Sequence, residues 1–295
     1  MTGVQTCALP IFAIVDADDV SLPDRLMWEV EFLEKHPEVG VVGGAVDWID
    51  ASGSPMANFV PPPGVTLRPV TANCEIQSAL VKYNPFWQPT VLMRRDAFVL
   101  VGGYRPAFAP TEDYDLWLRI SEHFEMANLS RVVLNYRIHP YQVSIRRRKQ
   151  QTLCTLAAVA SAASRRSGNP DPLDPVKEVT PGMLVGLGIS EAKQQSALAN
   201  EYLGWIHSLC GAGEWSGALN TAIEMLRSSG WKHIERRTRA DMRLEVAGLY
   251  WKNHRFLKAI MTAGHAVITR PRIAGRPLRP LFRRVRLVDS STAGK

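Results

Sequence analysis

The chain has 295 residues, of which 46% are hydrophobic, so it can bury the core of one large domain or of two smaller ones. No apolar run approaches the ~20 residues of a membrane-spanning helix, and the first residues lack the pattern of a signal peptide, so we expect a cytoplasmic protein. The four cysteines are widely spaced and include no Cys-x-x-Cys, which argues against a zinc site and a disulfide framework.

The formal net charge of +7 belongs to the second half of the chain. Residues 1–150 carry 14 Lys and Arg against 17 Asp and Glu, which leaves 21 against 11, or +10, for residues 151–295. Seven arginines between residues 270 and 286 are interspersed with three prolines, which interrupt a regular helix and argue against a DNA-recognition helix. We therefore predict no nucleic-acid partner and a solvated tail, with an anionic membrane surface as the alternative.

An acidic strand end is the most informative feature of the first half. An apolar run from Phe12 to Val15 predicts a buried strand, and Asp16, Asp18 and Asp19 follow where it ends. Carboxylates this close together repel one another unless a cation joins them, and such hard oxygen ligands suit Mg²⁺ or Mn²⁺ bridging a diphosphate. From this stretch alone, an acidic turn that caps the next helix explains the same residues equally well.

Strand and helix patterns alternate through the first 150 residues. The helix predicted after Ser21 has an apolar stripe formed by Leu22, Leu26, Val30 and Leu33. Residues 39–42 and 45–49 indicate strand that is broken at Gly43-Gly44, and strand, helix and strand at this spacing predict a βαβ unit in a largely parallel sheet. Further strands are predicted at 90–93 and 131–138, further helices at 75–82, 96–102 and from residue 111, and a long proline-rich loop at 54–73.

Beyond residue 150 only helical patterns remain. Residues 203–226 and 244–268 align with each other at a shift of 41, so that Trp215 matches Phe256 and Ala218 matches Ala259. This pattern resembles tetratricopeptide-like helical pairs, although an ordinary helical bundle explains it almost as well. We expect a linker and helix at 151–175, a helical domain at 176–268 and a basic Pro/Arg-rich tail at 269–295.

Four pieces in order carry a resemblance to a known family. They are Asp16-Ala-Asp-Asp19, residues 84–95, the Thr-Glu-Asp-Tyr-Asp-Leu-Trp-Leu-Arg of residues 111–119, and residues 136–144 with Tyr-Arg-Ile-His-Pro. Together they resemble the family-2 inverting glycosyltransferases of the GT-A fold, over about residues 12–145. The resemblance implies a partial GT-A, Rossmann-like α/β domain at 12–150. It also implies transfer of a sugar, with inversion, from a nucleotide-sugar to a glycan or lipid-linked acceptor in cell-surface polysaccharide synthesis.

The resemblance assigns roles to the carboxylates. Asp16 and Asp18 match the family's Asp-x-Asp, which implies that Asp18 ligates Mn²⁺ or Mg²⁺ and that Asp16 lies near the ribose or the metal. Asp113 matches the general base, and Glu112 is the alternative. Inverting transfer needs a metal to neutralise the departing diphosphate and a carboxylate to take the acceptor proton. A helix N-terminus would lower the pKa of Asp113, whereas nearby tryptophans would raise it by desolvation, so the sequence leaves the direction open.

Further residues complete the implied site. His139 matches a position that approaches the diphosphate or the metal, and Arg137 is a second phosphate candidate. Trp87, Gln88 and Trp117 are expected on the acceptor side, although many relatives carry His at the position of Gln88.

The start of the chain departs from the family's pattern. The family places two or three strands, which carry the base pocket, before the position of Asp16, whereas eleven residues precede Phe12 here. We expect residues 1–11 to be a foreign leader on an N-terminally truncated domain. The resemblance then implies that the chain by itself is weakly active or inactive.

Two other classes of function fit part of the sequence. Asp16-Ala-Asp-Asp-Val20 also matches the opening of haloacid-dehalogenase-like phosphohydrolases, in which Asp16 would be the phosphoryl nucleophile and Asp18 an acid/base. That family places its later acidic pair at a strand end, whereas here the later acidic group lies in a predicted helix. A third interpretation is a binding module whose catalytic half is inactive. If the basic tail binds lipid, the expected cytoplasmic location is at the inner membrane face.

Overall fold

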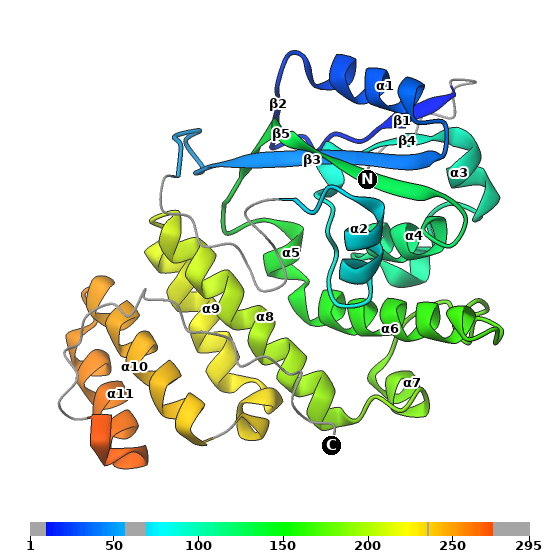
Figure 1. Cartoon of the computed structure of the whole chain (residues 1–295). Helices are drawn as coiled ribbons and strands as arrows, with labels where there is room; N and C mark the ends of the chain where they lie inside the picture. The colour runs from blue at the N-terminus through cyan, green and yellow to red at the C-terminus, as the bar shows by residue number, and fades with distance from the viewer. Residues whose placement is uncertain (1–9, 57–68, 235, 274–295) are drawn as a thin grey trace. The chain divides into compact units, whose positions relative to one another are not determined.

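The computed structural model describes residues 10–56, 69–234 and 236–273, and it forms two compact units that divide between residues 233 and 234 (Figure 1). The first unit holds a mixed sheet and most of the helices, and the second is a pair of helices. The expected leader at 1–11, the proline-rich loop at 54–73 and the tail at 269–295 fall mostly outside the described residues. Among the described helices, none is both long and apolar enough to span a membrane.

Five strands form the sheet in the order β1-β4-β3-β5-β2. They are β1 (Ile11–Ala13), β2 (Val20–Ser21), β3 (Val39–Ile49), β4 (Leu92–Arg94) and β5 (Glu125–Arg137). β3 and β5 run parallel, whereas β1–β4, β4–β3 and β5–β2 are antiparallel pairs. The prediction of a largely parallel sheet is therefore wrong. An apolar run marks a buried strand without indicating its direction, so the sequence pattern could not distinguish the two pairings.

Helices cover both faces of this sheet. The remaining elements of the first half are α1 (Arg25–Lys35), α2 (Asn73–Leu80), η1 (Gln88–Thr90), α3 (Arg95–Leu100), η2 (Pro106–Phe108), α4 (Glu112–Ile120) and α5 (Val143–Arg146). On one face, Val42 and Leu92 pack against Leu33 of α1. On the other face, Val41 belongs to a larger core with α2 and α4 (Figure 1). Burial on both faces explains why β3 is a nearly continuous apolar run.

Helix α1 buries charged residues where the apolar stripe was expected. Arg25, Glu29 and Leu33 form its fully buried face, whereas Leu26 is 49% exposed. Arg25 Nε donates to the Glu29 carboxylate at 3.1 Å, and Nη2 donates to the carbonyl oxygens of Ile14 and Val91 at 3.0 and 3.3 Å. The predicted stripe is thus wrong at Leu26. Positions 25, 29 and 33 follow one another at intervals of four residues and so share one face of the helix, and this is the face that is buried.

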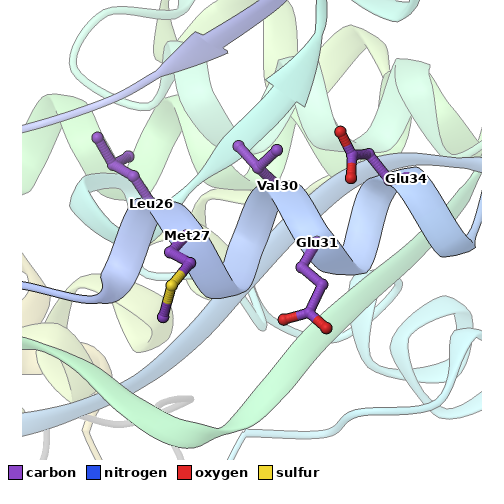
Figure 2. A pocket seen from close by; sticks show the side chains of 5 residues that line it. All are labelled: Leu26, Met27, Val30, Glu31 and Glu34. Carbon is purple, nitrogen blue, oxygen red and sulfur yellow. The ribbon is translucent and has the colours of Figure 1, made fainter.

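The outward side of α1 carries an open pocket. Figure 2 shows its lining side chains, which are Leu26, Met27, Val30, Glu31 and Glu34. All five come from α1, and none is a predicted site residue. The pocket therefore offers no additional support for the predicted chemistry.

The core of the first unit continues past the expected boundary at residue 150. α6 (Arg148–Arg166) packs on α4, and Leu153, Cys154 and Ala157 belong to the same core as Val41. α7 (Pro181–Gly186), α8 (Glu191–Gly211), α9 (Trp215–Arg227) and η3 (Ser229–His233) follow in this unit. Burial of α6 against the sheet domain explains why the division falls at 233 rather than at 150 or 175.

The second unit is a helical hairpin. It consists of α10 (Arg236–Lys252), α11 (Phe256–Thr269) and the short η4 (Pro271–Ile273). α9 begins at Trp215 and α11 begins at Phe256, which is the 41-residue shift that the sequence alignment contains. A tetratricopeptide-like identity for these pairs stays a prediction.

Candidate active site

The acidic segment crosses one end of the sheet. β1 and β2 lie at opposite edges, so residues 14–19, which join them, have to pass over the strands between. Because Val20 pairs with Asn135 and Ile49 pairs with Arg137, this end is where β3 and β5 terminate. The topology therefore brings the three aspartates to the carboxyl ends of the two parallel strands, which is a common place for ligand sites in α/β sheets.

Arg137, the last residue of β5, holds this acidic loop in place. Its backbone N–H donates to Asp19 Oδ1 at 2.8 Å, and its Nε donates to the carbonyl oxygen of Asp18 at 2.7 Å. Its Nη1 donates to the carbonyl oxygens of Asp50 and Ala51 at 3.1 and 3.2 Å. These bonds give Arg137 a structural role in shaping the loop. Its role in diphosphate binding stays a prediction.

His139 and Asp18 are in direct contact. His139 Nε2 lies 2.9 Å from Asp18 Oδ2, and the backbone N–H of Tyr141 donates to His139 Nδ1 at 3.3 Å. Because Nδ1 accepts a hydrogen bond, we assign the proton between the two side chains to Nε2. The Asp18 side chain is 45% exposed, so its carboxylate is open to a ligand from solvent.

Negative charge from distant parts of the chain converges on this loop. Burial, together with the charges of Asp18 and Glu112, raises the pKa of Asp16. Burial raises the pKa of Asp19 to about 7, despite the hydrogen bond from the Arg137 backbone. Since Glu112 belongs to α4, the loop and the N-terminal end of α4 form one electrostatic cluster. Clustered carboxylates with perturbed pKa values are typical of functional sites.

The residues fit a divalent cation that is shared with a substrate. No three His, Cys, Asp or Glu side chains in the described parts of the chain are grouped closely enough for an all-protein metal site. Mg²⁺ and similar ions, however, often bind through one or two carboxylates together with substrate phosphates. The exposed carboxylate of Asp18, with Asp16 two residues earlier, matches that kind of site.

Asp113 occupies the first turn of α4 and has one positioned partner. Asn84 Nδ2 donates to Asp113 Oδ2 at 3.0 Å. Burial raises the pKa of Asp113 to about 7, and the charge of Glu112 adds to this effect, while the backbone N–H of Tyr114 and the Asn84 side chain oppose it. Desolvation therefore outweighs the helix N-terminus, which settles the direction that the sequence left open. A carboxylate with a pKa near 7 is suited to general base catalysis at neutral pH.

Glu112 lies beside Asp113 with an unpaired oxygen. Its Oε2 is buried and has no hydrogen-bond partner among the described residues. A buried carboxylate oxygen without a donor costs free energy, about 1–3 kcal/mol or more for a charged group. A ligand hydroxyl that donates to this oxygen would remove the cost.

The expected acceptor-side residues divide into two groups. Trp87 packs with Trp48 and Tyr136, with ring centroids 4.7 and 4.9 Å apart, and Gln88 shares a hydrogen bond with the buried Tyr104 hydroxyl. Trp117 instead is fully buried. An acceptor-facing position is therefore wrong for Trp117, because α4 turns this side chain into the core rather than toward a surface.

Sequence reasoning missed three aromatic neighbours of the acidic cluster. Burial raises the pKa of the Tyr136 hydroxyl, and the charges of four aspartates, at positions 16, 18, 19 and 113, add to this effect. Burial and the charges of Asp113, Glu112 and Asp16 likewise raise the pKa of Tyr104. Trp48, on β3, contacts Tyr136 at 5.4 Å between ring centroids. The one sequence signal for Tyr136 was its place directly before Arg137.

Comparisons with known proteins identify relatives for part of the chain. It is 32% identical over 146 residues to the amylovoran biosynthesis glycosyltransferase AmsE of Erwinia amylovora. The alignment covers 49% of this chain and 51% of that protein. It is 33% identical over 140 residues to the O-antigen biosynthesis glycosyltransferase WbnJ of Escherichia coli. This alignment covers 46% of this chain and 51% of that protein.

Other comparisons add less. No family model matches the chain. The alignment with the solved structure of TarS from S. aureus covers 88% of this chain and 67% of the TarS chain, at 13% sequence identity and a TM-score of 0.35. So weak a structural similarity supports no conclusion. The chain spans about half the length of the curated relatives it matches. Over about half of its own length, the chain is therefore similar to curated glycosyltransferases.

Proposed function

We propose that this chain carries the metal and acceptor part of a family-2, GT-A-type glycosyltransferase. The enzyme would transfer a sugar, with inversion, from a nucleotide-sugar to a glycan or lipid-linked acceptor in polysaccharide synthesis. The observation that supports this most is the convergence of the Asp16–Asp18 loop, His139 and Asp113 at one end of the sheet, in a chain similar to glycosyltransferases. A cytoplasmic location, at the inner face of the membrane, is part of the same proposal.

Asp18 and Asp16 would hold Mn²⁺ or Mg²⁺ together with the donor diphosphate. When bound, the cation supplies positive charge that stabilises the departing nucleoside diphosphate. His139 restrains the Asp18 carboxylate through its Nε2 proton, and Arg137 holds the carbonyl oxygen of Asp18 and the carboxylate of Asp19. These contacts preorganise the loop, so less ordering is required when the donor binds.

Asp113 would take the proton from the acceptor hydroxyl. As that proton moves to the carboxylate, the acceptor oxygen forms a bond to the anomeric carbon, and the bond from this carbon to the diphosphate oxygen breaks on the opposite side. Asn84 orients Asp113 by donating a hydrogen bond to its Oδ2. Glu112 Oε2, which is buried and has no hydrogen-bond partner among the described residues, would be a second oxygen able to accept a hydrogen bond from the acceptor.

The phosphohydrolase alternative is not favoured. That family places its later acidic pair at a strand end, whereas Glu112 and Asp113 lie in the first turn of helix α4. The named relatives are glycosyltransferases.

The proposal is tested by incubating the purified chain with UDP- and GDP-sugars and with a generic aryl phosphate, each with and without Mn²⁺. Mn²⁺-dependent release of UDP or GDP supports the transferase. Release of inorganic phosphate from the aryl compound supports the phosphohydrolase instead. If the chain neither binds UDP or GDP with Mn²⁺ nor releases phosphate, it acts as a binding module for another partner.

A further inference from the structure

Helix α11 exposes its large apolar residues and buries its small ones. Ala259 and Ala266 are buried, and Ala266 packs with Ala240 and Leu244 of α10. The opposite side carries Leu257, Ile260, Met261 and Ile268, which are 73%, 61%, 66% and 77% exposed. These four residues are separated by three, one and seven positions, so they form one stripe along the helix. We call this set the α11 stripe.

Two aromatic rings extend the stripe at the start of the helix. Trp251 and Phe256 are half-exposed, and their ring centroids lie 4.8 Å apart in an edge-to-face arrangement. Exposed apolar surface of this extent is unfavourable in water and marks an interaction surface. Aromatic residues at the end of such a stripe are typical of helices that lie at a membrane–water interface.

Positive charge accompanies the stripe. Arg255 and Lys258 are exposed at the start of α11, and Arg272 is exposed just beyond its end. The described residues from 252 to 273 contain five Lys and Arg and no Asp or Glu, which gives this segment a net charge of +5. An occupant of this surface therefore has to combine apolar and negatively charged groups.

We propose that α11 docks on an anionic lipid bilayer. The stripe would enter the boundary between headgroups and acyl chains, and the surrounding lysines and arginines would lie against anionic headgroups. Charge favours this occupant over a second copy of the chain, because pairing two copies through this face would bring two positively charged segments together. The inference does not depend on the transfer reaction, since it concerns only the second unit.

The test is co-sedimentation of the full chain with lipid vesicles. Vesicles of phosphatidylcholine with about 30% phosphatidylglycerol should bind the protein at least ~10-fold more tightly than pure phosphatidylcholine vesicles at ~0.1 M salt. The triple variant Leu257→Ser/Ile260→Ser/Met261→Ser should lose at least ~10-fold in affinity for the anionic vesicles, because the stripe supplies the apolar contribution. A matched control is Val99→Ser/Leu100→Ser on α3, which removes apolar side chains of similar exposure and should bind as the wild type does.

Three results would overturn the proposal. They are equal binding by the triple variant and the control, equal binding of the wild type to neutral and anionic vesicles, and a dimer that the triple substitution dissociates while no vesicle binds. Circular dichroism checks that the triple variant keeps its helices. If the helices are lost, the Lys258→Glu variant is tested instead. Reversing this exposed charge next to the α11 stripe should weaken binding to anionic vesicles, and unchanged binding would contradict the proposal.

Discussion

Asp113 shows how burial can set the chemistry of a single carboxylate. The first turn of a helix favours a charged carboxylate, and Asn84 also donates to it, yet burial raises its pKa to about 7. The base would therefore be protonated in weak acid and ionised above neutrality. Its position and its pKa together make it the strongest candidate for the residue that takes the acceptor proton.

We predict that Asp113→Asn lowers kcat by at least ~10²-fold and leaves the Mn²⁺-dependent affinity for nucleotide nearly unchanged, because the base acts in the transition state. In the wild type, kcat/KM should rise with pH through about pH 7, as Asp113 loses its proton. Steady-state kinetics with Glu112→Gln as the matched control checks both points. A slower Glu112→Gln enzyme would mean that the neighbouring carboxylate is the base.

A second prediction concerns Arg137, whose side chain and backbone hold the acidic loop. Arg137→Ala removes the bonds from Nε to Asp18 and from Nη1 to Asp50 and Ala51, and keeps the backbone bond to Asp19. We expect Mn²⁺-dependent nucleotide affinity to fall by about 10-fold, because the loop becomes less ordered before binding. Arg131→Ala, on the same strand, is the control in isothermal titration. If both variants bind equally well, the loop does not need Arg137.

At the scale of elements, α1 couples the sheet to the loop that precedes the aspartates. Arg25 bridges Glu29 and the carbonyl of Ile14, which lies two residues before Asp16. Burial raises the pKa of Glu29 to about 7 even beside Arg25. Burying this ion pair therefore costs free energy of desolvation, and its structural effect is to fix the backbone at the start of the loop.

We predict that Arg25→Met lowers the free energy of unfolding by about 3 kcal/mol or more, because it leaves Glu29 buried without its partner and frees two carbonyl groups. Leu26→Ser, one residue along, should cost less than about 1 kcal/mol, because Leu26 is half-exposed. Urea unfolding of the two variants distinguishes these expectations. The opposite ranking would support the apolar stripe that the sequence pattern predicts.

Helices and strands of the first half were largely predictable as elements, and their arrangement was not. The predicted strand segments at 39–42 and 45–49 both belong to β3, which continues through Gly43 and Gly44, and the predicted helix from residue 111 is α4. The Asp-rich loop, Asp113 and His139 could be named from motifs alone. The convergence of Tyr136, Tyr104 and Asn84 on that cluster could not, because it depends on contacts between residues distant in sequence, such as Asn84 with Asp113, which periodicity does not encode.

At the scale of the whole molecule, three carboxylates with raised pKa values make stability depend on pH. The pKa values of Asp19, Glu29 and Asp113 are each raised to about 7, above the ordinary values of 3.8 and 4.5. Between about pH 4 and pH 7 the folded state therefore holds protons that the unfolded state has released, so the free energy of unfolding falls as pH rises through this window.

We therefore expect Tm to decrease between pH 5 and pH 8 in a metal-free buffer with chelator, as measured by calorimetry. Asp113→Asn should show a smaller decrease, since it removes one of the three groups. Parallel curves for the two proteins would mean that Asp113 titrates normally in the folded state.

Charge is also distributed unevenly along the sequence as a whole. The first 150 residues carry a net charge of −3, from 14 Lys and Arg against 17 Asp and Glu, and contain every residue of the proposed site. Sequence composition predicted this asymmetry. It could not predict the division at residue 233, because α6 becomes part of the first core through contacts with α4 that are distant in sequence.

The most direct test of the central claim is Mn²⁺-dependent binding of UDP or GDP, measured by isothermal titration for the wild type, Asp18→Asn and Asp24→Asn. Asp24 is a matched control, because it is exposed, lies six residues away and makes no capping hydrogen bond through its side chain. The account predicts that the wild type and Asp24→Asn bind a nucleotide only when Mn²⁺ is present, and that Asp18→Asn loses this binding. Equal Mn²⁺-dependent affinity in Asp18→Asn and the wild type would contradict it.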